Sequence, residues 1–437
     1  MPHATQPQRV PAQQVSARRP GWRHRAMHFL VVAGPGLIVM VADNDAGAVS
    51  TYTQAGAQYG TSLLWVLLLL LPVCYFVQEM VARLGIATGQ GHAAMIYQRF
   101  GKWWGRFSLF DLLLVNFFTI VTEFAAIDLA SRRLGLNPDV IVPLSAVCLI
   151  VLVGTGSYRR WERMTLALCG LNLAWLFLAW KVGPDARQAI RDTLVPSMPA
   201  GGITGDLVFL IIAIVGTTIA PWQLFFQQSC VADKRLRFAD LKAARLDTLI
   251  GAGAVVAFAA CMMLVGDALR RQGGSYEDPA QMAVALRSSI GETGSTLILL
   301  MMCNAALLGA TAISLSSAWA WGEVAGWKNT LQAKISDAPR FYAAYALGVA
   351  AAAGLVLIPG APLQTIIVAV QVLAGVMLPS AIIFLQLLLN DREMLGARFA
   401  NRPWNNWVNW TVITVLFALS LLLAVQVILP GLFPAAA

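Results

Sequence analysis

Two carboxylates and an amide lie in the middle of an otherwise apolar segment, residues 34–60. The interruption consists of Asp43, Asn44 and Asp45, and Gly47 follows closely. A carboxylate at bilayer depth costs roughly 2.5 to 3.5 kcal/mol or more, so such residues usually mark a pathway for an ion or a substrate. Irregular backbone at that depth is tolerated only where it is buried in protein or lines a wet cavity. The segment therefore predicts a broken membrane helix that lines such a pathway.

A second apolar segment, residues 206–231, is interrupted in a similar way. Thr217 and its neighbours precede Pro221, which lacks an N–H and disfavours a helical conformation at Ala220. Two interrupted segments in corresponding halves of a polytopic chain indicate a transporter binding site near the bilayer midplane. We expect Asp45 and the backbone around Ala220 to face each other across a cation site.

The composition is that of an integral membrane protein. The 437 residues are 58% hydrophobic and 12% charged, with a mean hydropathy of +0.67, whereas soluble domains carry about 25% charged residues. The net charge of +9 is spread over short loops, which indicates membrane topology rather than a nucleic-acid partner. The six cysteines show no CxxC pairing and are expected to be small buried side chains. No nucleophile, base and metal constellation appears at one depth, so we do not expect an enzyme.

Windows of about 20 apolar residues predict an all-α fold with eleven transmembrane helices. The expected spans are 28–57 (broken), 61–84, 108–131, 139–157, 163–182, 206–231 (broken), 242–268, 293–325, 339–358, 362–390 and 406–430. The breaks open the first and sixth spans, which predicts two five-helix repeats of inverted topology. Segment 269–290 is expected to form a short amphipathic helix outside the membrane.

The predicted domain organisation follows from these spans. Residues 1–26 form a disordered cytoplasmic tail, 27–182 the first five-helix repeat, 183–390 the second repeat, and 391–437 a loop and the extra helix 11. With the N-terminus in the cytoplasm, 23 of the 31 basic residues lie on the cytoplasmic side and 8 outside. The positive-inside rule supports this orientation, with the C-terminus outside.

Several motifs resemble the natural resistance-associated macrophage protein (NRAMP) family of divalent metal transporters. They are GPG at 34–36, Asp-x-Gly at 45–47, QAGA at 54–57 and ARLGIATGQG at 82–91. The resemblance thins in the middle of the chain and returns at Gln371 and at Leu378-Pro379. It implies an amino-acid transporter-like fold with a metal site at the two broken helices, and a divalent metal ion as the substrate.

The chain departs from the family pattern at both breaks. In span 1 the family has Asp-Pro-Gly-Asn, and here Ala48 replaces the Asn ligand while Asp45 and Gly47 remain. In span 6 the family has Met-Pro-His, and here Ala220 and Trp222 replace the soft Met ligand and the His tied to proton coupling.

The departures continue in span 3, where Glu123 matches a family acid but Ile120 replaces an acid found in many members. This pattern resembles the NRAMP-related magnesium transporters, a prokaryotic branch that takes up Mg²⁺ and also Mn²⁺ and is regarded as not proton-coupled. The resemblance implies an inner (plasma) membrane protein that needs no cofactor other than its transported ion. No obligate protein partner is evident.

The expected donors are all oxygens, which suits a hard cation. They are the Asp45 carboxylate, the Gln371 amide oxygen and the backbone carbonyls near Asn44 and Thr217. Ala48 and Ala220 leave room for an ion that keeps part of its water, as Mg²⁺ does.

Other polar residues near the breaks have open roles. Asp43 could be a second ligand, a group that holds a water of the ion, or a vestibule residue, and Gln223 could line the cavity or bond a neighbouring helix. We assign gating or permeation roles to Glu123, Gly47, Pro221 and Trp222.

Three other functions compete with Mg²⁺ and Mn²⁺ transport. A proton-coupled transporter of Mn²⁺ or other transition metals would be the ordinary family member. A coupled transporter of small organic solutes could use the same scaffold, and would bind its solute without any dependence on Mg²⁺. A channel would carry ions far faster than a carrier and would not saturate at low substrate.

Overall fold

The structure is a computed structural model that describes residues 28–29, 31–199 and 202–428, and every regular element in these residues is helical. The predicted tail, residues 1–26, lies outside the described residues. The helices of the first part are α2 (Pro35–Ala42), α3 (Ala46–Tyr59), α4 (Leu64–Thr88), α5 (His92–Arg133), α6 (Pro138–Gly154), α7 (Tyr158–Leu171), α8 (Ala174–Lys181) and α9 (Ala186–Leu194). Those of the second part are α10 (Gly205–Thr218), α11 (Pro221–Asp233), α12 (Leu241–Arg271), α13 (Pro279–Ala285), α14 (Arg287–Ala325), α15 (Pro339–Val356), α16 (Leu363–Asn390), α17 (Arg392–Phe399) and α18 (Pro403–Ile428).

Nine helical segments of the described chain are long and apolar enough to cross a membrane. They correspond to the expected spans 2, 3 and 5 to 11. The fourth expected span is α6, which has 17 residues and is apolar but shorter. The first expected span is divided between α2 and α3. The all-helical membrane architecture is confirmed, and the count of eleven crossings stays a prediction.

The first break separates α2 from α3 at the predicted place. Asp43 follows the last turn of α2, and Asp45 adopts an extended conformation (φ −75°, ψ −170°) before α3 begins. The Asp45 carboxylate accepts a hydrogen bond of 2.9 Å from Ala48 N, which satisfies one free N–H of the first turn of α3. Aspartate favours this N-cap position because its short side chain reaches those N–H groups. The chain therefore ends one helix and starts another within three residues.

The second break separates α10 from α11. Ile219 leaves the helical conformation (φ −141°, ψ 88°), Ala220 is extended (φ −92°, ψ 149°), and Pro221 is the first residue of α11. Proline suits this position because the N–H it lacks would have no partner in the first turn of a helix. Both interruptions that the sequence predicts are thus present, and each ends one helix and starts another.

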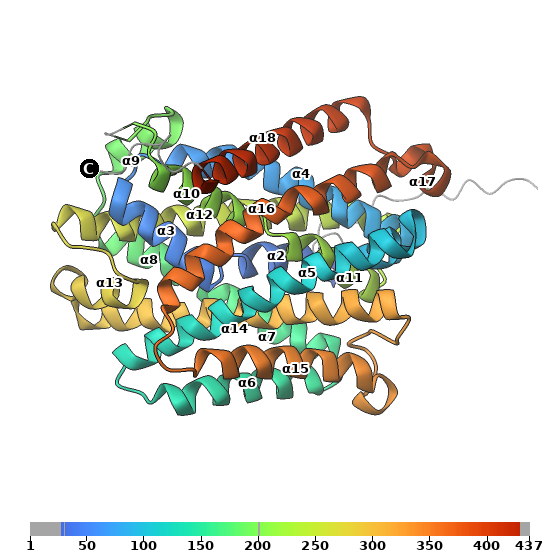
Figure 1. The fold of residues 1–437 in the computed structure, drawn as a ribbon, viewed down its shortest axis with the longest axis horizontal. Coiled ribbons are helices and arrows are strands. Elements are labelled where there is room, and N and C mark those ends of the chain that lie inside the picture. Colours follow the sequence, from blue (N-terminus) through green and yellow to red (C-terminus); the bar gives the residue numbers. More distant parts are fainter. Residues whose placement is uncertain (1–27, 30, 200–201, 429–437) are drawn as a thin grey trace, which may run out of the picture.

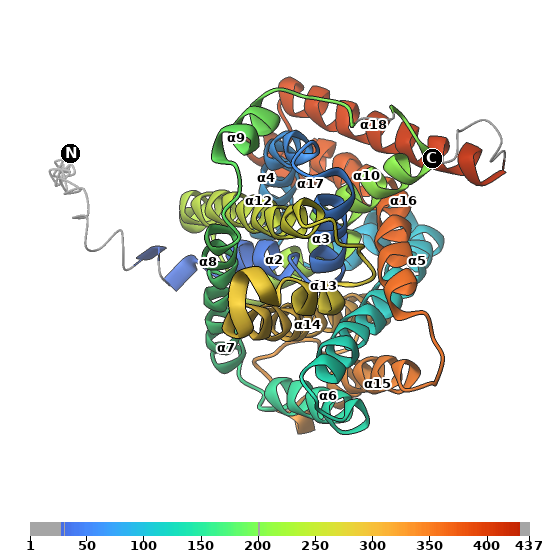
Figure 2. The ribbon, with the colours of Figure 1, turned by 90° about the vertical axis from the view of Figure 1, so that its left-hand side faces the viewer.

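The broken helices lie inside the bundle. Most long helices run along the long axis of the molecule (Figure 1), and the view along the bundle places α2 and α3 in its middle, with α18 at one edge and α6 beside α15 at the opposite edge (Figure 2). Helix α3 packs against α10, α12 and α16, while α2 packs against α11 and α12. The two breaks are therefore enclosed by protein, as irregular backbone at bilayer depth requires.

Several elements differ in detail from the expected spans. The third span belongs to the longer α5, which starts at His92 and bends at Gly101 (φ 88°). His92, the first residue of α5, is fully buried and forms a hydrogen bond with Gln228 Oε1. The fifth span is divided into α7 and α8 by a turn at Asn172. Segment 269–290 contains the expected short helix, α13.

Candidate metal site

Asp43 is a buried carboxylate without a hydrogen-bond partner. It is 1% exposed, and both Oδ1 and Oδ2 lack any donor within hydrogen-bond distance. A buried charge carries a penalty of several kcal/mol, which only a counter-charge or good hydrogen bonds offset. The folded protein therefore holds Asp43 where a cation or a proton must neutralise it.

The neighbours of Asp43 come from the second broken helix, from α4 and from α3. Gln223, in the first turn of α11, lies next to Asp43. Its Oε1 accepts a hydrogen bond of 2.9 Å from Gln78 Nε2, while its own Nε2 is buried without a partner beside the carboxylate. Cys74 and Tyr52 also lie close to Asp43. These contacts join the two breaks directly.

Asp45 occupies a different environment from Asp43, although only Asn44 separates them. Besides capping α3, its side chain lies beside Glu123 of α5. Glu123 Oε2 accepts a hydrogen bond of 3.0 Å from Ala46 N, and its Oε1 has no partner. Gly309 of α14 permits this approach, because an added Cβ there would lie 2.7 Å from Asp45 Cβ and 2.9 Å from Glu123 Cδ. The two carboxylates thus share one buried corner.

Gln371 of α16 links the two broken helices from the other side. A Cβ added to Gly47 would lie 1.8 Å from Gln371 Nε2, and one added to Gly216 would lie 2.1 Å from the Gln371 carbonyl oxygen. The absence of a side chain at both glycines is what lets α16 reach the breaks. Gln371 Nε2 and Thr217 Oγ1 are buried without hydrogen-bond partners. The Thr217 hydroxyl oxygen is free to contact an ion, whereas the Gln371 amide N–H2 is free to donate to a water that the ion carries.

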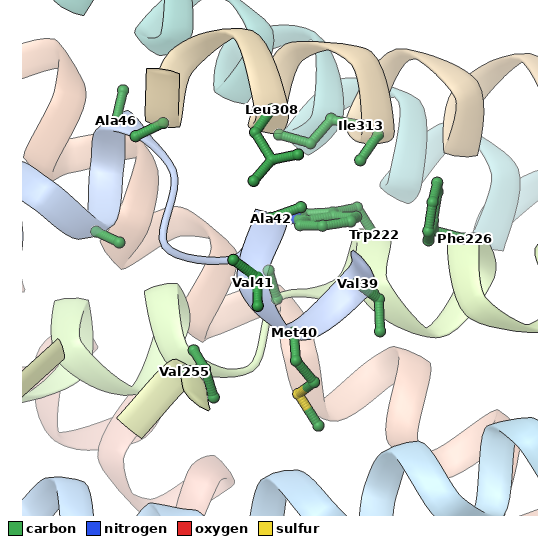
Figure 3. Close-up of a cluster of buried hydrophobic side chains, with 14 of the residues drawn as sticks. Val39, Met40, Val41, Ala42, Ala46, Trp222, Phe226, Val255, Leu308 and Ile313 are labelled. Carbon is green, nitrogen blue, oxygen red and sulfur yellow. The ribbon is translucent and has the colours of Figure 1, made fainter. Parts of the chain in front are cut away.

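The backbone of the second break is held by apolar packing. Trp222 follows Pro221 and is 1% exposed, and its carbonyl accepts a hydrogen bond of 3.0 Å from Ser316 Oγ of α14. Its ring belongs, with Ala42 at the end of α2, to the cluster of buried apolar side chains drawn in Figure 3. The Ala220 side chain is buried beside this cluster. Packing and this hydrogen bond therefore fix the position of the unwound backbone.

The predicted site residues fall into two groups around the breaks. Asp43 and Gln223 lie together on the α11 side, whereas Asp45, Ala48 and Glu123 lie together on the α5 side. Gln371 and Gly47 are in contact, and Gln371 also reaches the backbone beside Thr217. Asn44, between the two carboxylates, donates from Nδ2 to Val255 O at 3.3 Å, and its Oδ1 is free.

Some neighbours of the site are absent from the sequence-based prediction. Tyr52, Cys74, Gln78 and Thr218 surround Asp43 and the second break. Gln78 gives one signal in the sequence, because it is an amide within the apolar run of α4. The others are residue types that helix cores commonly contain, so only the packing of α3, α4 and α10 reveals them.

The arrangement is chemically suited to a cation. The C-terminal ends of α2 and α10 direct partial negative charge toward the breaks, and two carboxylates lie at the first of them. In the described part of the chain, no group of three or more His, Cys, Asp or Glu side chains is placed to chelate a metal. The donors are instead carboxylate, amide and hydroxyl oxygens, so the site favours an ion that retains water over one that needs a closed cage.

Comparisons with known proteins show which family the chain belongs to. Residues 36–426 match the model of the family described as natural resistance-associated macrophage protein-like. The divalent metal cation transporter MntH of Staphylococcus aureus is 25% identical over 91% of this chain and 91% of its own length. The metal transporter Nramp6.2 of Populus trichocarpa is 30% identical over 229 residues, which are 50% of this chain and 39% of that protein.

Solved structures show the same fold. A manganese transporter of Eremococcus coleocola superimposes with a TM-score of 0.76, at 19% identity, over 93% of this chain and 88% of that one. The transporter MhsT, solved with L-phenylalanine, has a TM-score of 0.57 at 14% identity, over 92% of this chain and 100% of that one. On the match over residues 36–426, the chain belongs to the natural resistance-associated macrophage protein-like (Nramp) family.

Proposed function

We propose that this protein transports divalent cations, Mg²⁺ and also Mn²⁺, across a prokaryotic plasma membrane without obligatory proton coupling. The relatives described as divalent metal cation and manganese transporters support this class of substrate. The proposed topology has eleven crossings, two inverted five-helix repeats and an extra last helix, with the N-terminus in the cytoplasm. The positive-inside asymmetry supports that orientation.

The observation that carries the proposal is the pair of carboxylates at the first break. Both oxygens of Asp43 lack partners, and Asp45 lies two residues away at the start of α3. Two buried carboxylates this close repel each other unless a positive charge lies near them. A divalent cation between the breaks would neutralise both and would explain why the side chains are kept in the bundle.

The donor chemistry favours Mg²⁺ over softer metals. Thr217 Oγ1 and Asn44 Oδ1 are free oxygen donors, and Ala220 offers no soft ligand at the second break. A sulfur atom does lie near Asp43, in Cys74, but its thiol group is directed to Thr218 O at 3.5 Å. A thiol must lose its proton before it becomes a good metal ligand, so Cys74 adds little affinity for a soft ion.

Alternating access requires that the half-helices move, and the structure shows what holds them. Asp247 of α12 accepts hydrogen bonds from Gly34 N (3.2 Å) and Gly36 N (2.7 Å) at the start of α2. Beyond the break, in the second turn of α3, the Tyr276 hydroxyl donates to Ser50 O at 3.0 Å. Breaking one set of contacts while keeping the other would open the site to one side at a time.

The test is transport by purified protein in liposomes that contain a Mg²⁺-sensitive dye and a pH-sensitive dye. We expect saturable Mg²⁺ entry without acidification, and Mn²⁺ entry that competes with it. The variant Asp43→Asn keeps the side-chain shape and removes the charge, so it should lose uptake, whereas Asp128→Asn, at a carboxylate paired with Arg132 away from the breaks, should retain it. Equal uptake by wild type and Asp43→Asn would contradict the proposed site.

Proton-coupled transport of Mn²⁺ is the second candidate, and Glu123 favours it. This acid is fully buried, lies against Asp45 and has one free oxygen, which is a suitable arrangement for a proton acceptor. The same liposomes separate the two functions, because obligatory acidification with Mn²⁺ entry and no Mg²⁺ entry would establish the second candidate.

A further inference from the structure

A basic pocket lies apart from the metal site, at the end of the bundle that the positive-inside rule assigns to the cytoplasm. Its cavity has a volume of about 280 Å³. Helix α4 provides one wall, α12 another, and the end of α17 with the start of α18 closes the remainder. Figure 1 shows α17 and the first turns of α18 together at this end of the bundle.

The charge of the basic pocket is strongly positive. Its lining contains four arginines and one glutamate, a net charge of +3: Arg83, Arg245, Arg398, Arg402 and Glu79. Such a concentration of like charge is unfavourable in a partly enclosed cavity unless an anion is present. The ordinary explanation, a set of internal ion pairs, accounts for only half of these arginines.

Two of the arginines share Glu79 as an ion-pair partner. Its Oε1 accepts hydrogen bonds from Arg245 Nε (2.9 Å) and Nη2 (2.7 Å), and Arg83 Nε lies 3.3 Å from the same oxygen. The Arg83 side chain is 6% exposed and also donates to Asn401 Oδ1 at 2.8 Å. These bonds hold Arg83 and Arg245 in the wall, so the positive surface of the basic pocket is already formed before a ligand binds.

The other two arginines have no acidic partner. Neither Arg398 nor Arg402 forms an ion pair with any residue that the structure describes. Both are exposed, and the Arg398 guanidinium lies 3.4 Å from the centroid of the Phe238 ring, a cation–π contact that fixes its position. Their donors are therefore free for an anion, and guanidinium groups bind phosphate oxygens with well-matched geometry.

The remaining wall is aromatic. The Phe76 and Trp404 rings pack edge to face, with centroids 5.4 Å apart. Trp404 is 48% exposed and Trp407, one turn on, is 79% exposed. Tryptophans in these positions mark the level of the lipid headgroups. A ligand in the basic pocket would thus contact arginines with one end and aromatic surface with the other.

We propose that the basic pocket binds the phosphate of an anionic phospholipid from the cytoplasmic leaflet. Arg398 and Arg402 contact the phosphate oxygens, Arg83 and Arg245 supply fixed positive charge behind them, and Phe76 with Trp404 contacts the glycerol and the upper acyl chain. Basic pockets between membrane helices on this side recognise anionic headgroups in this way. A soluble phosphate ester shares the phosphate chemistry but would make no use of the aromatic wall.

The test is lipid binding by full-length delipidated protein, measured by native mass spectrometry. Phosphatidylglycerol is titrated against phosphatidylcholine with identical acyl chains. We expect preferential binding of phosphatidylglycerol, and an affinity about fivefold lower in each of Arg398→Gln and Arg402→Gln, from a contribution of about 1 kcal/mol per arginine. Arg106→Gln removes an exposed arginine outside the basic pocket and should leave binding unchanged.

Several results would overturn the proposal. Equal binding of the two lipids, or equal losses in Arg106→Gln and Arg398→Gln, would show that the basic pocket does not select the headgroup. Glycerol phosphate, added as the soluble source of the same chemistry, should bind far more weakly than the lipid and should be insensitive to Trp404→Ala. If it binds as tightly as the lipid, the ligand is a soluble phosphate. Because lipid is counted directly, these outcomes are independent of the transported ion.

Discussion

The Tyr52 hydroxyl lies 2.7 Å from Thr218 Oγ1, and this hydrogen bond joins the second half of the first broken helix to the last residue before the second break. The Thr218 carbonyl is also engaged, at 3.5 Å, by Cys74 of α4. The side chains of Tyr52 and Cys74 also lie close to Asp43. The relative position of the two breaks is therefore set by a small polar cluster and not by the apolar core alone.

Removing this link should affect transport more than folding. Tyr52→Phe deletes one buried hydrogen bond, which should lower the free energy of unfolding by about 1 kcal/mol and reduce Mg²⁺ uptake, because the two half-helices lose their registration. Tyr342→Phe is the matched control, since its hydroxyl donates to Ala333 O at 2.6 Å away from the breaks. Thermal unfolding and liposome uptake are measured for both. Similar uptake in the two variants would show that the Tyr52 bond is only structural.

The charge and the capping role of Asp45 can be separated. Asparagine is as good an N-cap as aspartate, whereas alanine costs about 1 kcal/mol. Asp45→Asn should therefore keep the stability of the wild type and lose Mg²⁺ uptake, while Asp45→Ala should lose both. Unfolding temperature and uptake are again the measurements. If Asp45→Asn takes up Mg²⁺ and Asp45→Ala does not, Asp45 caps the helix and does not bind the ion.

The contact between Gly47 and Gln371 should be sensitive to a single methyl group. Gly47→Ala places a Cβ 1.8 Å from Gln371 Nε2, so the amide must move away. A flexible side chain can do so, and we expect a folded protein whose metal affinity falls about 10- to 100-fold, as for residues that orient a ligand. Isothermal titration with Mn²⁺ measures this loss. Adding Gln371→Ala to Gly47→Ala should bring no further loss, because the amide is already displaced.

Gly216 of α10 also lies close to Gln371, but it faces backbone atoms instead of a side chain. A Cβ at Gly216 would lie 2.1 Å from the Gln371 carbonyl oxygen and 2.5 Å from Gly375 N, which are backbone atoms. Backbone cannot rotate out of the way, so Gly216→Ala should force α10 and α16 apart and lower the yield of folded protein. A well-folded Gly216→Ala variant would show that this helix pair is less tightly packed than the structure indicates.

A soft ligand introduced at the second break should change the ion preference. Ala220→Met places a thioether next to the unwound backbone, and thioethers favour transition metals over Mg²⁺. We expect uptake of Cd²⁺ and Mn²⁺ to rise relative to Mg²⁺, measured by competition in liposomes. Ala220→Leu has a similar volume without sulfur and controls for crowding. If both variants lose Mg²⁺ uptake equally and neither gains Cd²⁺ uptake, Ala220 does not face the ion.

Much of the fold could be read from local patterns. Asp45 and Pro221 predict the two breaks because each residue type has a strong preference at the start of a helix. In the structure, α3 and α11 begin at these places. The division of the fifth span at Asn172 was not predictable, because one glycine and one asparagine in a largely apolar run are also common inside membrane helices. Hydropathy measures transfer into lipid and does not detect a single missing hydrogen bond.

The sequence by itself determined that this is a helical membrane protein with carboxylates at an interrupted helix, because apolar composition and helix-breaking residues act locally. Only the tertiary structure decided that Asp43 lies next to Gln223 while Asp45 lies against Glu123. These partners are separated by many residues along the chain, and their proximity depends on how α5, α11 and α14 pack. Side-chain neighbours across a bundle result from packing geometry, which a linear pattern does not record.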